Sequence, residues 1–189
     1  MASSTPAYNL PYLELDDAPD IAGATEDLAV AVDAELSRID ANVAAINGMT
    51  PVVGSSAVNV SSASTAFTAT ATPFGVSFVA PPSGAVAITL SGYFTQSQDG
   101  GVALMSYTLR TGSVVGSGTT VGTAANSNRA LVAGGPVDSG QPIYFQASRR
   151  TLWTGLTAGA AYNARVEVAV DLGGGINVFY RELQVEPLL

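Results

Sequence analysis

The sequence predicts a mainly β protein, in which an N-terminal extended arm and a short coiled-coil helix precede an antiparallel, jelly-roll-like β-sandwich head. Three observations support this prediction. An early segment carries an apolar heptad pattern, short alternating segments separated by Gly- and Pro-rich turns follow it, and the negative charge is confined to the first quarter of the chain. We therefore divide the chain into residues 1–23 (docking arm), 24–48 (oligomerisation helix), 49–65 (linker or edge strand) and 66–189 (β-sandwich head).

The composition excludes several classes of function. The 189 residues include no Cys and no His, and the seven basic residues are all Arg. Disulfides, thiolate or imidazole metal sites, Ser-His-Asp or Cys-His nucleophiles and Walker-type phosphate loops therefore cannot be built. A net charge of -8 without a basic stripe argues against nucleic-acid binding. We expect no enzyme activity, no catalytic residue, no metal and no cofactor.

The charge is divided unevenly along the chain. Residues 1–48 hold nine acidic residues and one Arg, whereas residues 49–189 hold six acidic residues and six Arg. Such asymmetry indicates two parts with different roles. Residues 41–98 carry no charge, but Ser, Thr, Pro and Gly interrupt this stretch throughout, so we expect no membrane insertion.

Residues 1–23 are expected to form an extended docking arm. Pro6 and Pro11 prevent a regular helix, and the apolar side chains have no helical period. Such a segment cannot bury itself well, so it packs either on its own domain or, as we favour, on another protein. The residues expected to make this contact are Tyr8, Leu10, Tyr12, Leu13 and Leu15.

Residues 24–48 carry the clearest periodicity of the chain. Apolar residues recur at alternating spacings of four and three, which is the seam of a coiled coil, and Gly48 provides a stop signal. The predicted oligomerisation seam consists of Val32, Leu36, Ile39, Val43 and Ile46.

The partner of this helix is left open by the sequence. A helix of about three heptads is marginal alone, and its mixture of Leu, Val and Ile favours a homotrimer. Against self-association, Asp33, Glu35 and Asp40 fall at e and g positions, where identical chains repel each other. We favour self-association over packing on the chain's own C-terminal domain.

Short strands and turns fill the rest of the chain. Residues 86–91 and 162–170 alternate with a period of two, which predicts one buried and one wet face. The turn signals between such segments are typical of an antiparallel sandwich or jelly roll. Further strands are predicted at residues 66–72, 75–79, 102–110, 129–132, 143–148 and 176–185.

Two groups of head residues are candidates for chemistry. Trp153 with Arg149 and Arg150 is a candidate surface-ligand site for a sugar or an anion; the alternative is that Trp153 covers one end of the core and the arginines pair with acids. Glu167 and Asp171 share one face of a predicted strand, but a shared face is not a cleft, so we do not assign them to glycoside hydrolysis.

Residues 154–166 resemble the tyrosine-corner segment of fibronectin type III and related β-sandwiches. The segment runs TGLTAGAAYNARV, with Tyr162 at the corner position. The resemblance implies that the Tyr162 hydroxyl bonds to backbone a few residues upstream. It implies a structural role for Tyr162 and says nothing about chemistry.

The order of motifs along nearly the whole chain resembles minor tail or fibre-type virion proteins of phages that infect actinobacteria. The motifs lie at residues 10–12 with the acidic turn after them, 33–40, 78–84, 109–112, 156–162 and 180–187. The resemblance implies an N-terminal virion anchor that docks on another virion protein, a short oligomeric stalk and a β-sandwich head. The head is a candidate for adhesion to a host cell-surface glycan. The resemblance also implies a virion location, on tail or capsid, after synthesis in the host cytoplasm. The alternatives are a carbohydrate-binding or adhesion module of a bacterial surface assembly and a capsid decoration protein.

Overall fold

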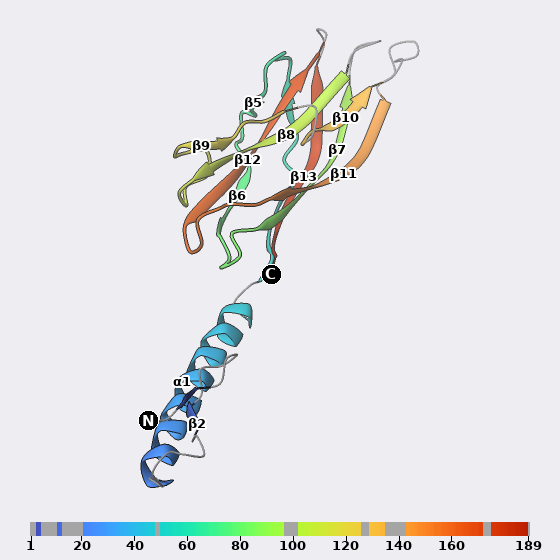
Figure 1. Cartoon of the computed structure of the whole chain (residues 1–189). Coiled ribbons are helices and arrows are strands. Elements are labelled where there is room, and N and C mark those ends of the chain that lie inside the picture. Colours follow the sequence, from blue (N-terminus) through green and yellow to red (C-terminus); the bar gives the residue numbers. More distant parts are fainter. Residues whose placement is uncertain are drawn as a thin grey trace. The chain divides into compact units, whose positions relative to one another are not determined.

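The computed structural model describes residues 3–4, 11–12, 21–47, 50–96, 102–125, 129–134, 143–171 and 175–188. The chain divides into two compact units, Met1–Met49 and Thr50–Leu189 (Figure 1). One N-terminal helix is followed by two antiparallel sheets that form a β-sandwich. The predicted fold class is therefore confirmed.

The first unit contains a helix and a short strand pair. Helix α1 spans Ile21–Asn47, so it begins three residues before the predicted start at Ala24. Strands β1 (Ser3–Ser4) and β2 (Pro11–Tyr12) pair antiparallel. Because the helix starts early, Glu26 and Asp27 lie beyond its first turn, which holds no acidic residue. No helix within the described residues is both long and apolar enough to cross a membrane.

The second unit is the sandwich, and its two sheets are named sheet I and sheet II here. Sheet I has the strand order β11 (Ile143–Trp153), β7 (Val86–Gln96), β13 (Ile176–Pro187) and β3 (Val52–Ser56), with β4 (Val60–Ser62) also on β13. Sheet II has the order β10 (Leu131–Gly134), β8 (Val102–Thr111), β12 (Ala161–Val170) and β5 (Thr68–Ala69), with β6 (Gly75–Val79) on β12 and β9 (Thr120–Gly122) on β8.

The core lies between the sheets and follows the period of two. On β7, the side chains of Ile88, Leu90 and Phe94 are buried in the core, whereas Ser91 and Tyr93 reach the opposite face. Sheet II faces them with buried residues of β8 and β12, namely Met105, Tyr107, Leu109, Ala164, Val166 and Val168. This alternation leaves sheet I with an outer face that is free to carry other side chains.

Several strand boundaries differ from the predicted ones. The strand predicted at residues 66–72 is reduced to β5, and β11 continues through two arginines as far as Trp153 because β7 supplies a partner for every residue. Strand β9 was not predicted, since its polar, Gly-rich surroundings are typical of a loop. Residues 49–65 contribute β3 and β4, both of which pair with β13.

The chain enters and leaves the sandwich at the same end of sheet I. Val52, at the start of β3, is paired with Val185, close to the end of β13. The other half of β13 pairs with the other end of β7, where Tyr180 lies opposite Tyr93. Sheet I therefore has one end close to both chain termini of this unit and one end remote from them.

Candidate functional site

The predicted seam lies on the exposed surface of α1. The side chains of Val32, Leu36, Ile39 and Val43 are between 39% and 53% exposed. Ile46 lies on the same helix, but its side chain is outside the described ones. A single chain thus leaves four consecutive seam positions in contact with water.

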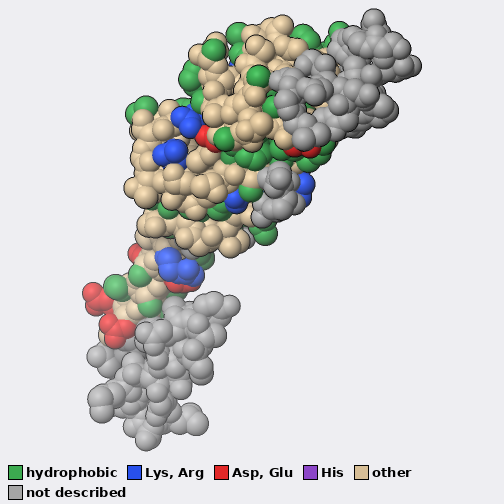
Figure 2. Space-filling model, turned by 90° about the horizontal axis from the view of Figure 1, so that it is seen from above, with side chains coloured by type: hydrophobic (Ala, Val, Ile, Leu, Met, Phe, Trp, Pro, Cys, Tyr) green, Lys and Arg blue, Asp and Glu red, His purple; other side chains and the backbone are tan. Residues whose placement is uncertain are grey.

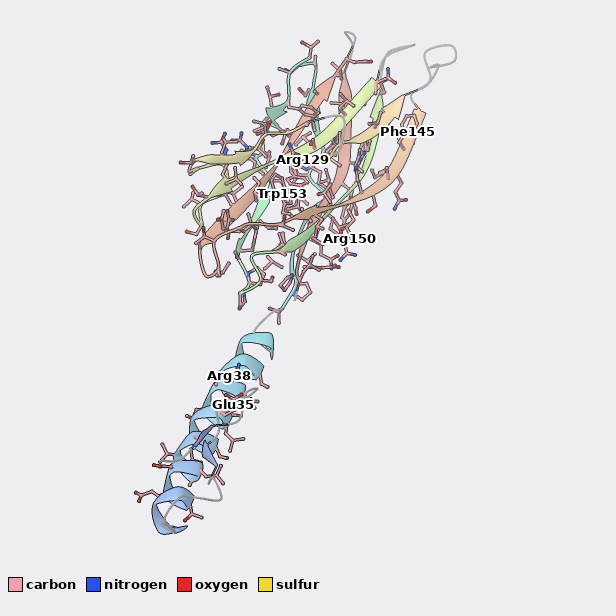
Figure 3. All side chains as sticks on the ribbon, viewed as in Figure 1. Glu35, Arg38, Arg129, Phe145, Arg150 and Trp153 are labelled. Atoms are coloured by element: carbon pink, nitrogen blue, oxygen red, sulfur yellow. The ribbon has the colours of Figure 1, made fainter. Side chains whose placement is uncertain are left out.

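The charges beside this seam are mostly uncompensated. Arg38 binds Glu35 within the same helix, at 2.5 Å and 2.9 Å, and this hydrogen bond lowers the pKa of the Glu35 carboxyl (Figure 3). Asp33 and Asp40 are exposed. Since Arg38 is engaged by its neighbour, two such helices would bring carboxylates together at the margins of the seam.

The predicted docking arm falls almost wholly outside the described residues. Tyr8, Leu10, Leu13 and Leu15 all lie there, and the docking prediction for them stays a prediction. Tyr12 lies in β2, where it pairs with Ser3 through the backbone.

The three residues predicted as a ligand site divide between two sides of β11. Trp153 and Arg150, with Arg129, Thr151 and Leu152, line a hollow of about 360 Å³ (Figure 3). Arg149 lies on the same side of β11 as Trp153, opposite to Arg150, and donates a hydrogen bond of 3.4 Å to the carbonyl of Ala130. Arg150 forms an ion pair of 2.5 Å with Glu186.

The ring of Trp153 is packed on several sides. Its Nε1 donates a hydrogen bond of 2.6 Å to the hydroxyl of Tyr107. The guanidinium of Arg129 lies 4.9 Å from the ring centroid, and a Cβ added to Gly122 would lie 2.0 Å from the ring. These contacts show that Trp153 mainly packs against its neighbours. The more exposed side chains that line the hollow are Leu152 and Arg150.

The carboxylates of the head that the structure describes have local partners. Glu167 is buried and forms an ion pair of 2.6 Å with Arg165. Asp171 accepts a hydrogen bond of 2.5 Å from the backbone N–H of Val102. Neither arrangement is the pair of facing carboxyl groups that glycoside hydrolysis requires. Within the described residues, no three His, Cys, Asp or Glu side chains gather as metal ligands.

Tyr162 is tied to the segment before it. Its hydroxyl accepts a hydrogen bond of 3.0 Å from the backbone N–H of Thr157, five residues upstream. Its ring stacks on Phe78 with centroids 5.9 Å apart. The side chain therefore connects β12 to β6 and to the preceding turn.

A surface feature that the sequence analysis missed lies on the outer face of sheet I. The rings of Tyr93, Tyr144 and Phe179 form a cluster that we name the aromatic platform. The ring centroid of Tyr93 lies 5.8 Å from that of Tyr144 and 5.5 Å from that of Phe179. The centroids of Tyr144 and Phe179 are 6.0 Å apart. Tyr93 is 37% exposed and Tyr144 is 55% exposed.

A β-bulge places the third ring of the platform. Val178 pairs with Phe94 and Tyr180 pairs with Tyr93, so Phe179 is an extra residue in β13. A bulge of this kind turns a side chain out of the regular alternation. No local sequence signal predicts it, because β7, β11 and β13 bring together residues far apart in the chain.

Polar side chains surround the platform. Ser91 donates a hydrogen bond of 3.0 Å to Ser148, and Gln146 is exposed beside them on β11. Tyr180 donates a hydrogen bond of 2.6 Å to Glu182, which raises the pKa of the Tyr180 hydroxyl. Figure 2 shows Arg and acidic side chains scattered in several places among the hydrophobic and other atoms on the described part of the visible face.

Comparisons with known proteins give a fold likeness alone. No protein-family model matches the sequence, and no curated protein shows significant similarity to it. Among solved structures, the CBM22-1 xylan-binding domain of Xyn10C from Paenibacillus barcinonensis is similar, with 13% sequence identity and a TM-score of 0.30. The match covers 55% of this chain and 57% of that one. At these values the likeness carries no argument about a ligand.

Proposed function

We propose that this chain is a non-catalytic adhesion protein that self-associates through α1 and displays its β-sandwich to a surface. The observation that supports this best is the exposure of the heptad seam on α1. Each fully buried Val, Leu or Ile side chain stabilises an assembly by roughly 1.5–3 kcal/mol. A second and a third copy of the helix would bury this seam, and its residue types favour three copies.

The resemblance of the motif order to fibre-type virion proteins is the reason to propose a location on a phage particle. In that setting the N-terminal arm docks on another virion protein, as part of a tail fibre or as a capsid decoration. The exposed aromatic platform favours a second candidate function, a carbohydrate-binding or adhesion module of a bacterial surface assembly. Both candidates share the oligomeric helix and the adhesive sandwich.

The self-association is tested by the mass of the full chain in solution. Light scattering coupled to gel filtration should give the mass of a trimer for the wild type. The double variant Leu36→Asp, Ile39→Asp should give a monomer whose sandwich still unfolds cooperatively. The matched control is Val30→Asp, which adds a charge at a 64% exposed apolar position of α1 outside the seam and should remain trimeric.

A monomeric wild type, or a double variant of unchanged mass, would contradict the oligomeric seam. The location is tested separately, by labelling purified phage particles with antibodies raised against the sandwich. Labelled particles support the virion setting. Labelling of bacterial cell surfaces in the absence of phage supports the alternative.

A further inference from the structure

We propose that the aromatic platform of Tyr93, Tyr144 and Phe179 binds the apolar face of neutral sugar rings in a polysaccharide. The inference deepens the proposed adhesive function, on which it rests, by naming the site and the class of ligand. It assigns binding to the remote half of the outer face of sheet I, away from the hollow beside Trp153.

The rings of the platform pack on one another and are held in place by the sheet. The rings of Tyr93 and Tyr144 are nearly parallel, inclined by 19° and stacked. The ring of Phe179 is tilted against both, by 43° to Tyr93 and by 31° to Tyr144. Each ring comes from a different strand of a hydrogen-bonded sheet, so little conformational entropy is lost when a ligand binds.

The core does not need these rings. On the inner side of the same strands, Phe94 and Phe145 pack with centroids 6.3 Å apart, and Phe94 is fully buried. The outward rings therefore remain in water, where apolar surface is unfavourable. The bulge adds Phe179 to them at the expense of regular strand pairing. An exposed apolar patch with a polar rim is typical of a binding surface.

The polar groups around the rings indicate a neutral ligand. Ser91, Ser148 and Gln146 offer uncharged hydroxyl and amide groups, and the carboxylate of Glu182 offers acceptors. Arg150, farther along β11, is already paired with Glu186. A sugar ring matches this surface, since its C–H face is apolar and its edge carries hydroxyl groups. A phosphate or sulfate ester would instead meet Glu182.

The position of the platform suits display. Val185 is paired with Val52, where the chain enters the sandwich, and Phe179 lies six residues before Val185 on β13. At about 3.3 Å per residue, the platform is about 20 Å from that end of sheet I. A ligand on the platform would therefore bind away from the attachment point of the sandwich.

Affinity electrophoresis of the full chain in gels that contain hydroxyethylcellulose, galactomannan or dextran tests the inference. We expect at least one of these neutral polysaccharides to retard the wild type. The double variant Tyr93→Ala, Tyr144→Ala should weaken the retardation at least about tenfold. Tyr144→Phe keeps the ring and should retain binding. The matched control is Leu152→Ala, which removes a 66% exposed apolar side chain of the same face outside the platform.

Four results would overturn the inference. These are no retardation by any neutral polysaccharide, equal retardation of wild type and double variant, retardation by dextran sulfate alone, and displacement of the platform's ligand by a proline-rich peptide but not by a sugar. Thermal unfolding of each variant shows whether it is folded, since both tyrosines are exposed and their loss should leave the fold intact. Trp153 is the sole tryptophan, and its fluorescence should not change on binding at the platform.

The same samples separate this inference from the self-association. A monomeric wild type that is retarded through Tyr93 and Tyr144 supports the platform and contradicts the α1 seam. A trimer that no neutral polysaccharide retards contradicts the platform and leaves the seam intact. The Leu36→Asp, Ile39→Asp variant should lose avidity but keep its dependence on the two tyrosines.

Discussion

The guanidinium of Arg181 donates a hydrogen bond of 2.7 Å to the hydroxyl of Thr70, which lies 111 residues earlier in the chain. Arg181 belongs to sheet I, and its side chain is fully buried. It also bonds to the carbonyl of Thr72 at 3.2 Å and to the hydroxyl of Ser56 at 3.3 Å, and lies over the ring of Phe74. Burial lowers the pKa of this guanidinium. Among the described residues, the hydrogen-bond acceptors of this buried guanidinium are thus uncharged oxygens, and none of them is a carboxylate.

Replacement of Arg181 by Ala should strongly destabilise the sandwich. The change leaves a cavity and removes the hydrogen bond that Arg181 donates to Thr70, so we expect the free energy of unfolding to fall by about 2–5 kcal/mol. Arg181→Met keeps most of the volume without a buried charge, and it should cost less than half as much. Urea denaturation measures both variants.

The control for this prediction is Arg150→Ala. Arg150 is exposed and pairs with Glu186 on the surface, so its loss should change the free energy of unfolding by about 1 kcal/mol or less. Equal losses for Arg181→Ala and Arg150→Ala would contradict a structural role for the buried cation.

The fold class was predictable from the sequence because it depends on local periods. The heptad residues of α1 and the alternation in β7 and β12 each repeat within a few residues, and the helix and the strands form where these patterns lie. The burial of Arg181 was not predictable, although it shares the inward register with Leu183 and Val185. A charge at an inward position is expected to face water unless distant residues supply its partners, and Thr70 and Ser56 do so here.

The aromatic platform was unpredictable for a different reason. Tyr93, Tyr144 and Phe179 meet only through the pairing of β7 with β11 and β13, which is long-range information. A shift of one residue in either register would turn the rings to the other face. The bulge at Phe179 is a further departure from strict alternation. Composition and spacing favoured Trp153 instead, because a lone Trp beside two arginines is visible within one short segment.

Substitution of Tyr162 by Phe tests the contact between its hydroxyl and the backbone. The change leaves the N–H of Thr157 without its hydrogen-bond partner, and should lower the free energy of unfolding by about 1–3 kcal/mol. Stacking on Phe78 is retained, so the far-ultraviolet circular dichroism spectrum of the folded state should not change. Tyr144→Phe, at an exposed ring, is the control and should have no measurable effect. Equal stability of Tyr162→Phe and wild type would remove the structural role of this hydroxyl.

The introduction of a methyl group at Gly122 should displace the ring of Trp153. A Cβ at this position would lie 2.0 Å from the far edge of the indole, closer than real contacts allow. We expect Gly122→Ala to cost about 1–3 kcal/mol and to shift the emission of the sole tryptophan. Thr120→Ala changes an exposed residue of the same short strand and should leave the emission unchanged. An unshifted spectrum for Gly122→Ala would contradict this packing.

High pH should destabilise the sandwich through Tyr107. Burial raises the pKa of its hydroxyl, which accepts a hydrogen bond from Trp153 and is bonded to Thr151. An unfolded tyrosine ionises near about pH 10, so this contribution is fully present below that pH and is lost as the pH rises through the folded pKa. Urea unfolding of wild type and Tyr107→Phe between about pH 9 and about pH 11 measures it.

The variant should be less stable at neutral pH but should lose less stability in this alkaline window. Tyr144→Phe serves as the comparison and should follow the wild type. Parallel pH profiles for the wild type and Tyr107→Phe would show that the buried hydroxyl does not contribute.

Salt should strengthen the proposed self-association of α1. Asp33 and Asp40 lie beside the seam, and Arg38 is held by Glu35. Association of identical helices therefore brings like charges together, and their repulsion is screened over about 10 Å at 0.1 M salt. Sedimentation equilibrium should give tighter association as salt is raised from about 0.05 M to about 0.5 M.

The variant Asp33→Asn, Asp40→Asn removes these charges and should associate tightly with little dependence on salt. Weaker association of the wild type at high salt would instead indicate attraction between charges, and would contradict a seam held together by Leu36 and Ile39.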